Sequence, residues 1–173
     1  MEIKDSGNRR VFQSGACRDM AEGKGREDLL PLHIIAEYYR NRGDGHIADI
    51  LDKIENFIRT GEKKNIYDCI RYFEDMFKNP EIKTTENMWL ELGRHMEQGI
   101  AKYGERNVEL GLPTHSFVDS AVRHFFKFIG GMKDEPHDRA FIWNLTYLLW
   151  TVENKPECND LPYTKEKADE DTT

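Results

Sequence analysis

The chain has 173 residues, 38% of them hydrophobic and 33% charged, and its formal net charge is −7. This acidity argues against free duplex nucleic acid as a partner, because phosphate contacts need a basic field. No apolar run approaches the length of a membrane span, and residues 1–10 lack the apolar core of a signal peptide, so we expect no membrane association. The three scattered cysteines, Cys17, Cys69 and Cys158, argue against a disulfide framework or a zinc site and favour a reducing compartment.

Apolar residues recur at helical spacing through most of the chain, and no stretch alternates as a strand would. The pattern predicts an all-α bundle of about six helices. Its start and stop signals are Pro, Thr and Gly residues. The first helix is expected at about 28–42 with Pro31 in its first turn, the next two form a hairpin around Gly61 that ends before Pro80, and the others begin near Thr84 or Thr85, near Thr114 and after Pro136.

The same signals divide the chain into three parts. We expect a loop-like N-terminal arm at 1–27, a helical domain at 28–154 and a flexible acidic tail at 155–173. The hairpin, at about 43–80, is interpreted as an insertion in that domain. In the fourth helix we expect the inward stripe to consist of Trp89, Leu92, Met96 and Ile100.

Several polar residues occupy positions that a packed bundle would avoid. Glu97 borders the stripe of the fourth helix with Gly93 and Ala101 one turn away on either side, so it is either a metal-binding carboxylate or a solvated residue beside a close helix contact. Asn144 lies on the apolar face of the last helix. A buried amide needs hydrogen-bond partners, which it could find in another helix or in a ligand.

Two further pairs have alternative interpretations. Asp119 and Arg123 are four residues apart, which predicts an ion pair within one helix, although Arg123 and His124 could also face a polyanion. Asp134 and Glu135 precede the last helix, where acids are favoured by the helix dipole alone.

His137 and Asp138 spell the HD dyad of metal phosphohydrolases. A true HD site needs a separate upstream histidine and a downstream aspartate on neighbouring helices. His124 could supply the first, but the next aspartate is Asp160, beyond the last strong helix.

Three stretches in this order, GACRDMAEGKGREDLLP, KYGERN and FVDSAVRHFFKFIGGMKDEPHDRAFIWNL, resemble the phage and bacterial dATP/dGTP diphosphohydrolase family, the MazZ-type proteins. That family is related to the MazG-like all-α pyrophosphohydrolases. The resemblance covers residues 14–42 and 88–150. There are two departures. The wider superfamily shows an ExxE pair followed by ExxD, whereas Arg94 stands three positions before Glu97 and no ExxD follows. Val108 stands where the family usually has Trp.

The resemblance implies hydrolysis of purine deoxynucleoside triphosphates to monophosphate and pyrophosphate. It also implies Mg²⁺ or Mn²⁺ held by carboxylates, a homodimer or homotetramer, and the cytoplasm of a bacterium or a phage-infected host. The residues expected in catalysis are Glu97, Asp119 and His137. Those expected to bind metal are Glu97, Asp119, Asp134 and Glu135. Those expected to bind substrate are Arg18, Asp19, Lys24, Arg26, Lys102, Tyr103, Arg106, Asn107, Arg123, His124 and Asn144.

The glycine-rich N-terminal stretch is interpreted as a loop that grips phosphate or base, with Arg18, Lys24 and Arg26 as anion contacts. It is not a Walker loop, because GKGRE lacks the GxxxxGK[ST] pattern. A solvated arm, or an arm that reaches another subunit, is the alternative. At the level of the whole chain, a non-enzymatic helical interaction protein that docks a partner through the hairpin remains a second hypothesis.

Overall fold

The computed structural model describes residues 7–77 and 88–164, and its contacts divide the chain into two compact units. Of the described residues, unit 1 contains 7–29 and 88–159, and unit 2 contains 30–77 and 160–164. The predicted all-α architecture is confirmed, with six α-helices in the described residues. No helix among them has the length and apolar character needed to cross a membrane.

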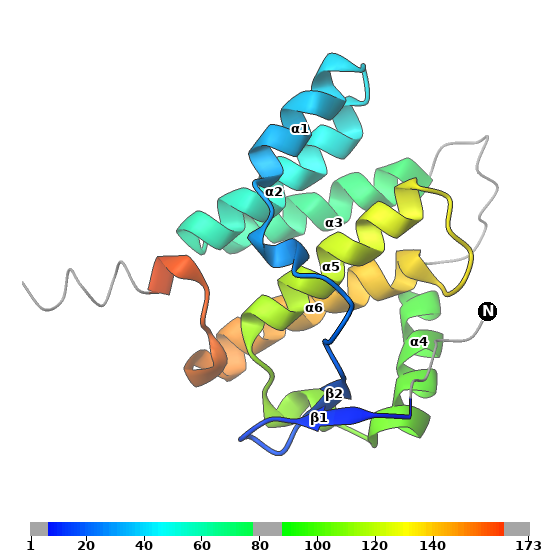
Figure 1. The fold of residues 1–173 in the computed structure, drawn as a ribbon, viewed down its shortest axis with the longest axis vertical. Helices are drawn as coiled ribbons and strands as arrows, with labels where there is room; N and C mark the ends of the chain where they lie inside the picture. The colour runs from blue at the N-terminus through cyan, green and yellow to red at the C-terminus, as the bar shows by residue number, and fades with distance from the viewer. Residues whose placement is uncertain (1–6, 78–87, 165–173) are drawn as a thin grey trace, which may run out of the picture. The chain divides into compact units, whose positions relative to one another are not determined.

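Unit 1 is built on two long helices, α5 (Thr114–Ile129) and α6 (His137–Asn154), which pack side by side (Figure 1). Phe125 and Phe141 meet between them with ring centroids 5.2 Å apart, and both are fully buried. Each such side chain contributes about 1.5–3 kcal/mol when removed from water. Both helices begin where the sequence predicts, directly after Pro113 and Pro136. The third helix of the unit, α4 (Met88–Tyr103), contacts α6.

The inward stripe predicted for α4 is wrong in part. Trp89 is 50% exposed and Ile100 is 44% exposed, whereas His95 is the buried residue of this helix. The helix turns the face with His95 and Gly99 toward a cavity, so its most apolar positions do not enter a packed core. The predicted start near Thr84 or Thr85 lies outside the described residues.

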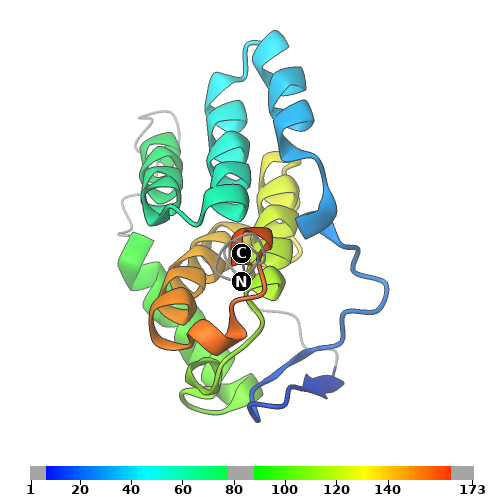
Figure 2. The same ribbon diagram turned by 90° about the vertical axis from the view of Figure 1, so that its left-hand side faces the viewer.

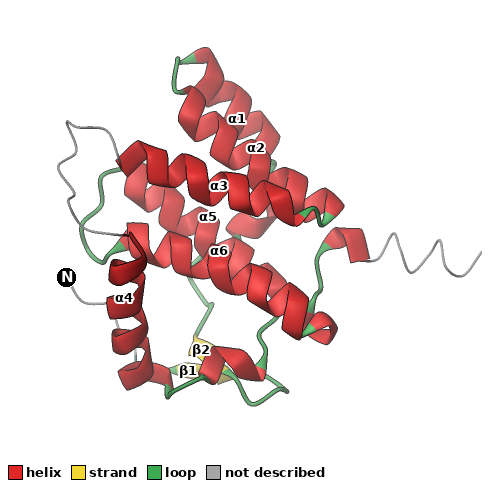
Figure 3. Cartoon of the chain, turned by 180° about the vertical axis from the view of Figure 1, so that it is seen from behind, coloured by secondary structure: helices red, strands yellow, loops and turns green. Residues whose placement is uncertain are grey.

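The N-terminal segment contains a small sheet that the sequence did not predict. Strands β1 (Arg9–Val11) and β2 (Cys17–Asp19) pair antiparallel (Figure 3). Gly15 lies in the turn between them at φ +86°, where a side chain would be strained. Three residues per strand are too few to show an alternating pattern. After β2 the chain reaches η1 (Glu27–Leu29), a short 3-10 helix that packs against α5.

Unit 2 consists of α1 (Leu32–Asn41), α2 (Gly45–Thr60) and α3 (Lys63–Phe77), with α2 in contact with both neighbours (Figure 2). The predicted hairpin is confirmed. Its two stripes form the core, which includes Ile50, Leu51, Ile54, Phe57, Ile66 and Phe73. The helix predicted at 28–42 begins at Leu32 and belongs to this unit together with the hairpin.

The first part of the predicted flexible tail is ordered. Residues 156–158 form η3 (Pro156–Cys158), and Leu161 and Tyr163 are buried. Within unit 2 the ring of Tyr163 covers Gly61 closely, so that a Cβ at Gly61 would lie 2.5 Å from the ring. The prediction failed here because two apolar side chains among charged ones do not form a periodic pattern. Residues 165–173 lie outside the described residues.

Candidate functional site

A cavity of about 640 Å³ lies within unit 1, between the N-terminal segment and helices α4, α5 and α6. Its lining contains seven cationic side chains against three carboxylates, although the chain as a whole is acidic. Such a local excess of positive charge favours a polyanionic ligand. The cations are Arg10, Arg18, Lys24, Lys102, Arg106, Arg123 and Lys127, and the carboxylates are Asp19, Asp119 and Glu135.

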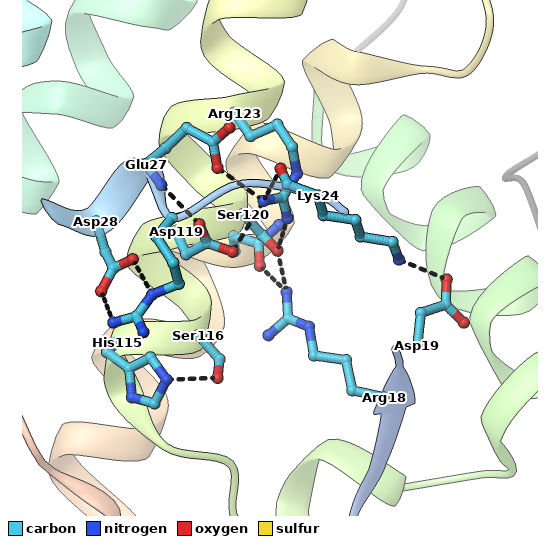
Figure 4. Close-up of polar contacts among 12 residues, drawn as sticks. Arg18, Asp19, Lys24, Glu27, Asp28, His115, Ser116, Asp119, Ser120 and Arg123 are labelled. Atoms are coloured by element: carbon cyan, nitrogen blue, oxygen red, sulfur yellow. Dashed lines mark hydrogen bonds and ion pairs between the residues drawn. The ribbon is translucent and has the colours of Figure 1, made fainter. Parts of the chain in front are cut away.

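Arg18 reaches from β2 to the helices and has no carboxylate partner among the described residues. Its Nη2 donates to Ser120 Oγ at 2.7 Å (Figure 4). The same atom donates to Asn144 Oδ1, also at 2.7 Å. Its Nη1 is buried and makes no hydrogen bond in the described structure. Burial lowers the pKa of Arg18 to about 10, so the side chain is still charged at neutral pH. A buried cation held only by neutral groups is suited to an incoming anion.

The register of the small sheet places a second arginine beside Arg18. Arg10 stands directly opposite Arg18, and both side chains line the cavity. Like charges opposite each other are destabilising. Burial lowers the pKa of Arg10 as well.

Asp19 anchors the segment at its other side. It pairs with Lys102 Nζ at 2.7 Å, Arg9 Nη1 at 3.3 Å and Lys24 Nζ at 3.4 Å. Burial acts to raise the pKa of Asp19, but hydrogen bonds and charges from Lys102, Tyr103 and Lys24 outweigh it and hold the pKa below its usual value. Asp19 is therefore a carboxylate that fixes the loop to the end of α4.

Asp119 and Arg123 form the predicted ion pair, with 2.8 Å between Oδ2 and Nη1. The other oxygen of Asp119 accepts the backbone N–H of Glu27 at 2.9 Å, and Glu27 Oε2 also pairs with Arg123 (Figure 4). Burial raises the pKa of Glu27, whereas Arg123 outweighs burial at Asp119 and lowers its pKa. Both oxygens of Asp119 are thus occupied in joining η1 to α5.

The KYGERN stretch, residues 102–107, is hydrogen-bonded to β2. Asn107 Oδ1 accepts the N–H of Cys17 at 2.7 Å, and Asn107 Nδ2 donates to the carbonyl of Cys17 at 2.8 Å. Gly104 ends α4 at φ +89°, and Arg106 follows at φ +56° with its side chain paired to Glu109 and largely exposed. The stretch therefore positions the N-terminal segment as well as lining the cavity.

A histidine cluster closes one side of the site. His124 on α5, Glu135 in the following loop and His137 at the start of α6 each place a donor atom within 4.8 Å of the others. The two Nδ1 atoms are 3.0 Å apart, and His137 Nε2 contacts Asp134 Oδ1 at 2.8 Å. Burial lowers the pKa of His124 well below its usual value, so the ring is neutral at neutral pH. Imidazole nitrogens beside a carboxylate suit a divalent cation.

Apolar side chains line another part of the cavity. Trp143 on α6 and Met96 on α4 meet there, with the indole Nε1 2.8 Å from the sulfur. His95 lies beside Trp143, and its Nδ1 makes no hydrogen bond in the described structure. Burial lowers the pKa of His95 to about 4, so this ring is also neutral. The cavity thus combines a cationic part with an aromatic part.

Comparison with known proteins gives one family. The model of the dATP/dGTP diphosphohydrolase N-terminal domain matches residues 78–161. This segment of the chain belongs to the dATP/dGTP diphosphohydrolase family. Searches of curated proteins and of solved structures give no significant match. The diphosphohydrolase segment includes KYGERN and the stretch through Asn144, whereas the N-terminal part of the resemblance, residues 14–42, lies outside it.

Most residues predicted for the site line the cavity. They are Arg18, Asp19, Lys24, Lys102, Tyr103, Arg106, Asn107, Asp119, Arg123, His124, Glu135 and Asn144. His137 and Asp134 join the histidine cluster through the contacts above. Arg26 does not line the cavity, because it turns back to pair with Asp28 at 2.7 Å and its side chain is 53% exposed.

Two residues of the predicted metal shell, Glu97 and Asp119, are not part of the histidine cluster. Glu97 is exposed on α4 and lies outside both the cavity lining and the histidine cluster, which agrees with the solvated alternative. Asp119 lines the cavity, but Arg123 and the Glu27 N–H occupy its oxygens. Spacing along one helix does not reveal what a neighbouring segment brings to it.

Among the lining residues that were not predicted for the site are Arg10, His95, Ser120, Lys127 and Trp143. Ser120 could have been found, since it lies one turn before Arg123. Its oxygen accepts hydrogen bonds from Arg18 and Arg123. His95 gave a weaker signal, because a single histidine next to a methionine on an amphipathic helix is more often structural.

Proposed function

We propose that the chain hydrolyses purine deoxynucleoside triphosphates to the monophosphate and pyrophosphate with the help of a divalent metal ion. The observation on which this rests most is Arg18, a buried cation without a carboxylate partner in the described residues, in the cavity of a diphosphohydrolase-family domain. A triphosphate would supply the missing negative charge. Charge-assisted hydrogen bonds of this kind contribute roughly 1.5–3 kcal/mol each.

Three cations are best placed for the phosphates. Arg18 offers its unpartnered Nη1. Lys24 is only loosely bound to Asp19, at 3.4 Å, and Lys127 is 3.6 Å from Glu135 and 3.7 Å from Asp134, so both could turn to a ligand. Lys102 and Arg123 are engaged with carboxylates and serve to hold the N-terminal segment closed. Because donors fixed in a water-poor cavity need little reorganisation, they favour the charge that develops on the leaving pyrophosphate.

The aromatic part of the cavity suits a base. Trp143 and Tyr103 offer faces for stacking, and the neutral ring of His95 can exchange a hydrogen bond with a base edge. The guanidinium carbon of Arg18 lies 5.9 Å from the centre of the Trp143 ring. One nucleotide is therefore long enough to reach both the aromatic part and the cationic part of the cavity.

The metal would be held by His124, Glu135 and His137. The resemblance predicts Mg²⁺ or Mn²⁺ as the ion, but it assigned the ligands to carboxylates. The donor set fits a divalent cation, since two imidazoles and a carboxylate converge. When bound, such an ion neutralises phosphate charge and activates water. The chain's own contribution is to keep the His124 ring neutral, because burial lowers its pKa, and to orient His137 through Asp134.

One observation favours the HD-type phosphohydrolase as a second candidate. His124 and His137 come together, as that alternative requires of an upstream histidine. The carboxylate of the cluster is Glu135, however, and Asp138 is not part of it. The pyrophosphohydrolase remains our first proposal.

Product analysis tests the proposal. The protein is incubated with each deoxynucleoside triphosphate and Mg²⁺ or Mn²⁺, and the products are resolved by phosphorus NMR. We expect equal amounts of monophosphate and pyrophosphate, with purine substrates turned over fastest. Release of intact triphosphate or of orthophosphate would favour the HD-type alternative. No turnover of any nucleotide would favour the non-enzymatic interaction protein. The homodimer or homotetramer stays a prediction, for which sedimentation analysis is the direct test.

A further inference from the structure

The histidine cluster differs in its chemistry from the carboxylate shell that the family resemblance implies. Its donors are two imidazoles, His124 and His137, and one carboxylate, Glu135. Mg²⁺ prefers oxygen ligands and keeps much of its water, whereas imidazole suits first-row transition ions. We propose that this cluster is a two-histidine, one-carboxylate site selective for a divalent transition metal ion over Mg²⁺.

The spacing of the donor atoms is the first argument. The Nδ1 atoms of His124 and His137 are 3.0 Å apart, and His137 Nδ1 is 3.9 Å from Glu135 Oε1. Two nitrogens bound to one ion at about 2.1 Å and at right angles would be about 3.0 Å apart. The side chains therefore already stand at the separation that a shared ion requires.

The partner of His137 is the second, independent argument. Its Nε2 lies 2.8 Å from Asp134 Oδ1, and a carboxylate can only accept this proton. The Nδ1 lone pair is thereby left to face His124. Metal-binding histidines characteristically donate their second nitrogen to a carboxylate in this way. Asp134 is then a positioning residue that fixes the tautomer and orientation of His137.

Lys127 is the cation that would compete with a metal ion for the carboxylates of Glu135 and Asp134. Its Nζ is 3.6 Å from Glu135 Oε1 and 3.7 Å from Asp134 Oδ2. These distances are long for an ion pair, and the side chain is 28% exposed, so it can turn away when an ion enters. The alternative without metal is a plain hydrogen bond between the two histidines.

The role of the bound ion rests on the proposed function. Binding of the ion itself can be measured without nucleotide. Co²⁺ is titrated into the metal-free full chain, and its visible absorption reports binding through nitrogen ligands. We expect one strongly bound Co²⁺ that millimolar Mg²⁺ does not displace. His124→Ala, His137→Ala and Glu135→Gln should each weaken binding at least tenfold, and Asp134→Asn about 10–100-fold. His46→Ala, an exposed histidine of α2, is the matched control and should bind like the wild type.

Two results would overturn the proposal: displacement of Co²⁺ by comparable Mg²⁺, or wild-type binding in the His124→Ala and His137→Ala variants. If a variant does not fold, Mn²⁺ broadening of the imidazole NMR signals in the wild type decides. The signals of His124 and His137 should disappear first while that of His46 remains. Unchanged signals would leave the plain hydrogen bond as the explanation. Metal binding without hydrolysis would disprove the proposed function but not this site.

Discussion

At the scale of single residues, the observation most relevant to the proposed activity is that Arg18 has no carboxylate partner in the described residues. Asn144 holds the guanidinium through a neutral amide oxygen at 2.7 Å. The sequence predicted that Asn144 would need a polar partner because it lies on an apolar helix face. It could not show that the partner comes from β2, 126 positions away in the chain.

Replacing this amide by a carboxylate should convert the anion site into an internal ion pair. In Asn144→Asp, the new carboxylate would neutralise Arg18 and repel phosphate. We expect KM for the nucleotide to rise at least tenfold, or about 1.4 kcal/mol. The nucleotide-free melting temperature should change by only a few degrees, because the ion pair with Arg18 offsets the loss of the hydrogen bond from Asn144 Nδ2 to the Ala140 carbonyl. Steady-state kinetics and thermal melting measure the two effects. Asn154→Asp, an exposed position on the same helix, is the control. An unchanged KM would remove Arg18 from substrate binding.

His95 should make stability depend on pH. Its pKa is about 4 in the folded protein against 6.5 for a free side chain, chiefly because of burial and also because of Arg139 and Lys102. Between these values the unfolded chain binds more protons, so the free energy of unfolding falls as pH decreases from 6.5 toward 4. From pH 7.5 to 5.5 the loss due to His95 is about 1.4 kcal/mol.

Urea denaturation at both pH values measures this loss. The variant His95→Phe should lose about 1.4 kcal/mol less than the wild type over the same interval. His46→Gln, on the exposed surface, should keep the wild-type dependence. Equal pH dependence in His95→Phe and the wild type would show that His95 is not buried as a neutral ring.

At the scale of elements, helices were predictable and the small sheet was not. Each helix repeats its apolar spacing over several turns and ends at Gly or Pro, so periodicity locates α1 to α6. The strands β1 and β2 depend on contacts with distant parts of the chain, among them the bonds from Asn107 to Cys17. The histidine cluster likewise requires the turn between α5 and α6 to bring residues 124 and 137 together. The resemblance supplied many of the residues, but their assembly needed the fold.

Asn107 should control how often the N-terminal segment opens. Asn107→Leu removes two hydrogen bonds to Cys17, which together contribute roughly 1–3 kcal/mol. We expect trypsin to cut after Arg18, Lys24 or Arg26 about tenfold faster or more, because cleavage requires local opening. Mass spectrometry of timed digests gives the rate. Asn56→Leu, exposed on α2, is the control. Cleavage at the wild-type rate would mean that other contacts hold the segment.

At the scale of the whole molecule, the excess charge of the cavity lining has the opposite sign to the net charge of the chain. The chain has a net charge of −7, yet the cavity lining has more cations than carboxylates. Composition alone therefore argued against duplex nucleic acid as a partner but gave no sign of an anion site. The division into two units was also not predicted, because the helix at 32–41 has the same pattern as the helices of unit 1.

This distribution predicts a dependence on salt. Raising the ionic strength from about 0.01 to about 0.1 M shortens the Debye length from about 30 to about 10 Å, which screens attraction of a triphosphate to the cavity. We expect KM to rise severalfold with little change in kcat. A neutral osmolyte at equal osmolality controls for effects other than charge. A KM that is constant or falls with salt would contradict a cationic substrate site.

The central claim is that the cavity of unit 1 is the active site and that Arg18 receives the phosphates. The most direct test compares the initial rate of pyrophosphate release from dATP or dGTP by the wild type and by Arg18→Met. Met keeps an unbranched side chain and removes a buried charge, so the melting temperature should change by only a few degrees. We predict steady pyrophosphate release by the wild type and a loss of about a hundredfold or more in kcat/KM for Arg18→Met. Equal rates in the two proteins, or no pyrophosphate from the wild type, would contradict the account.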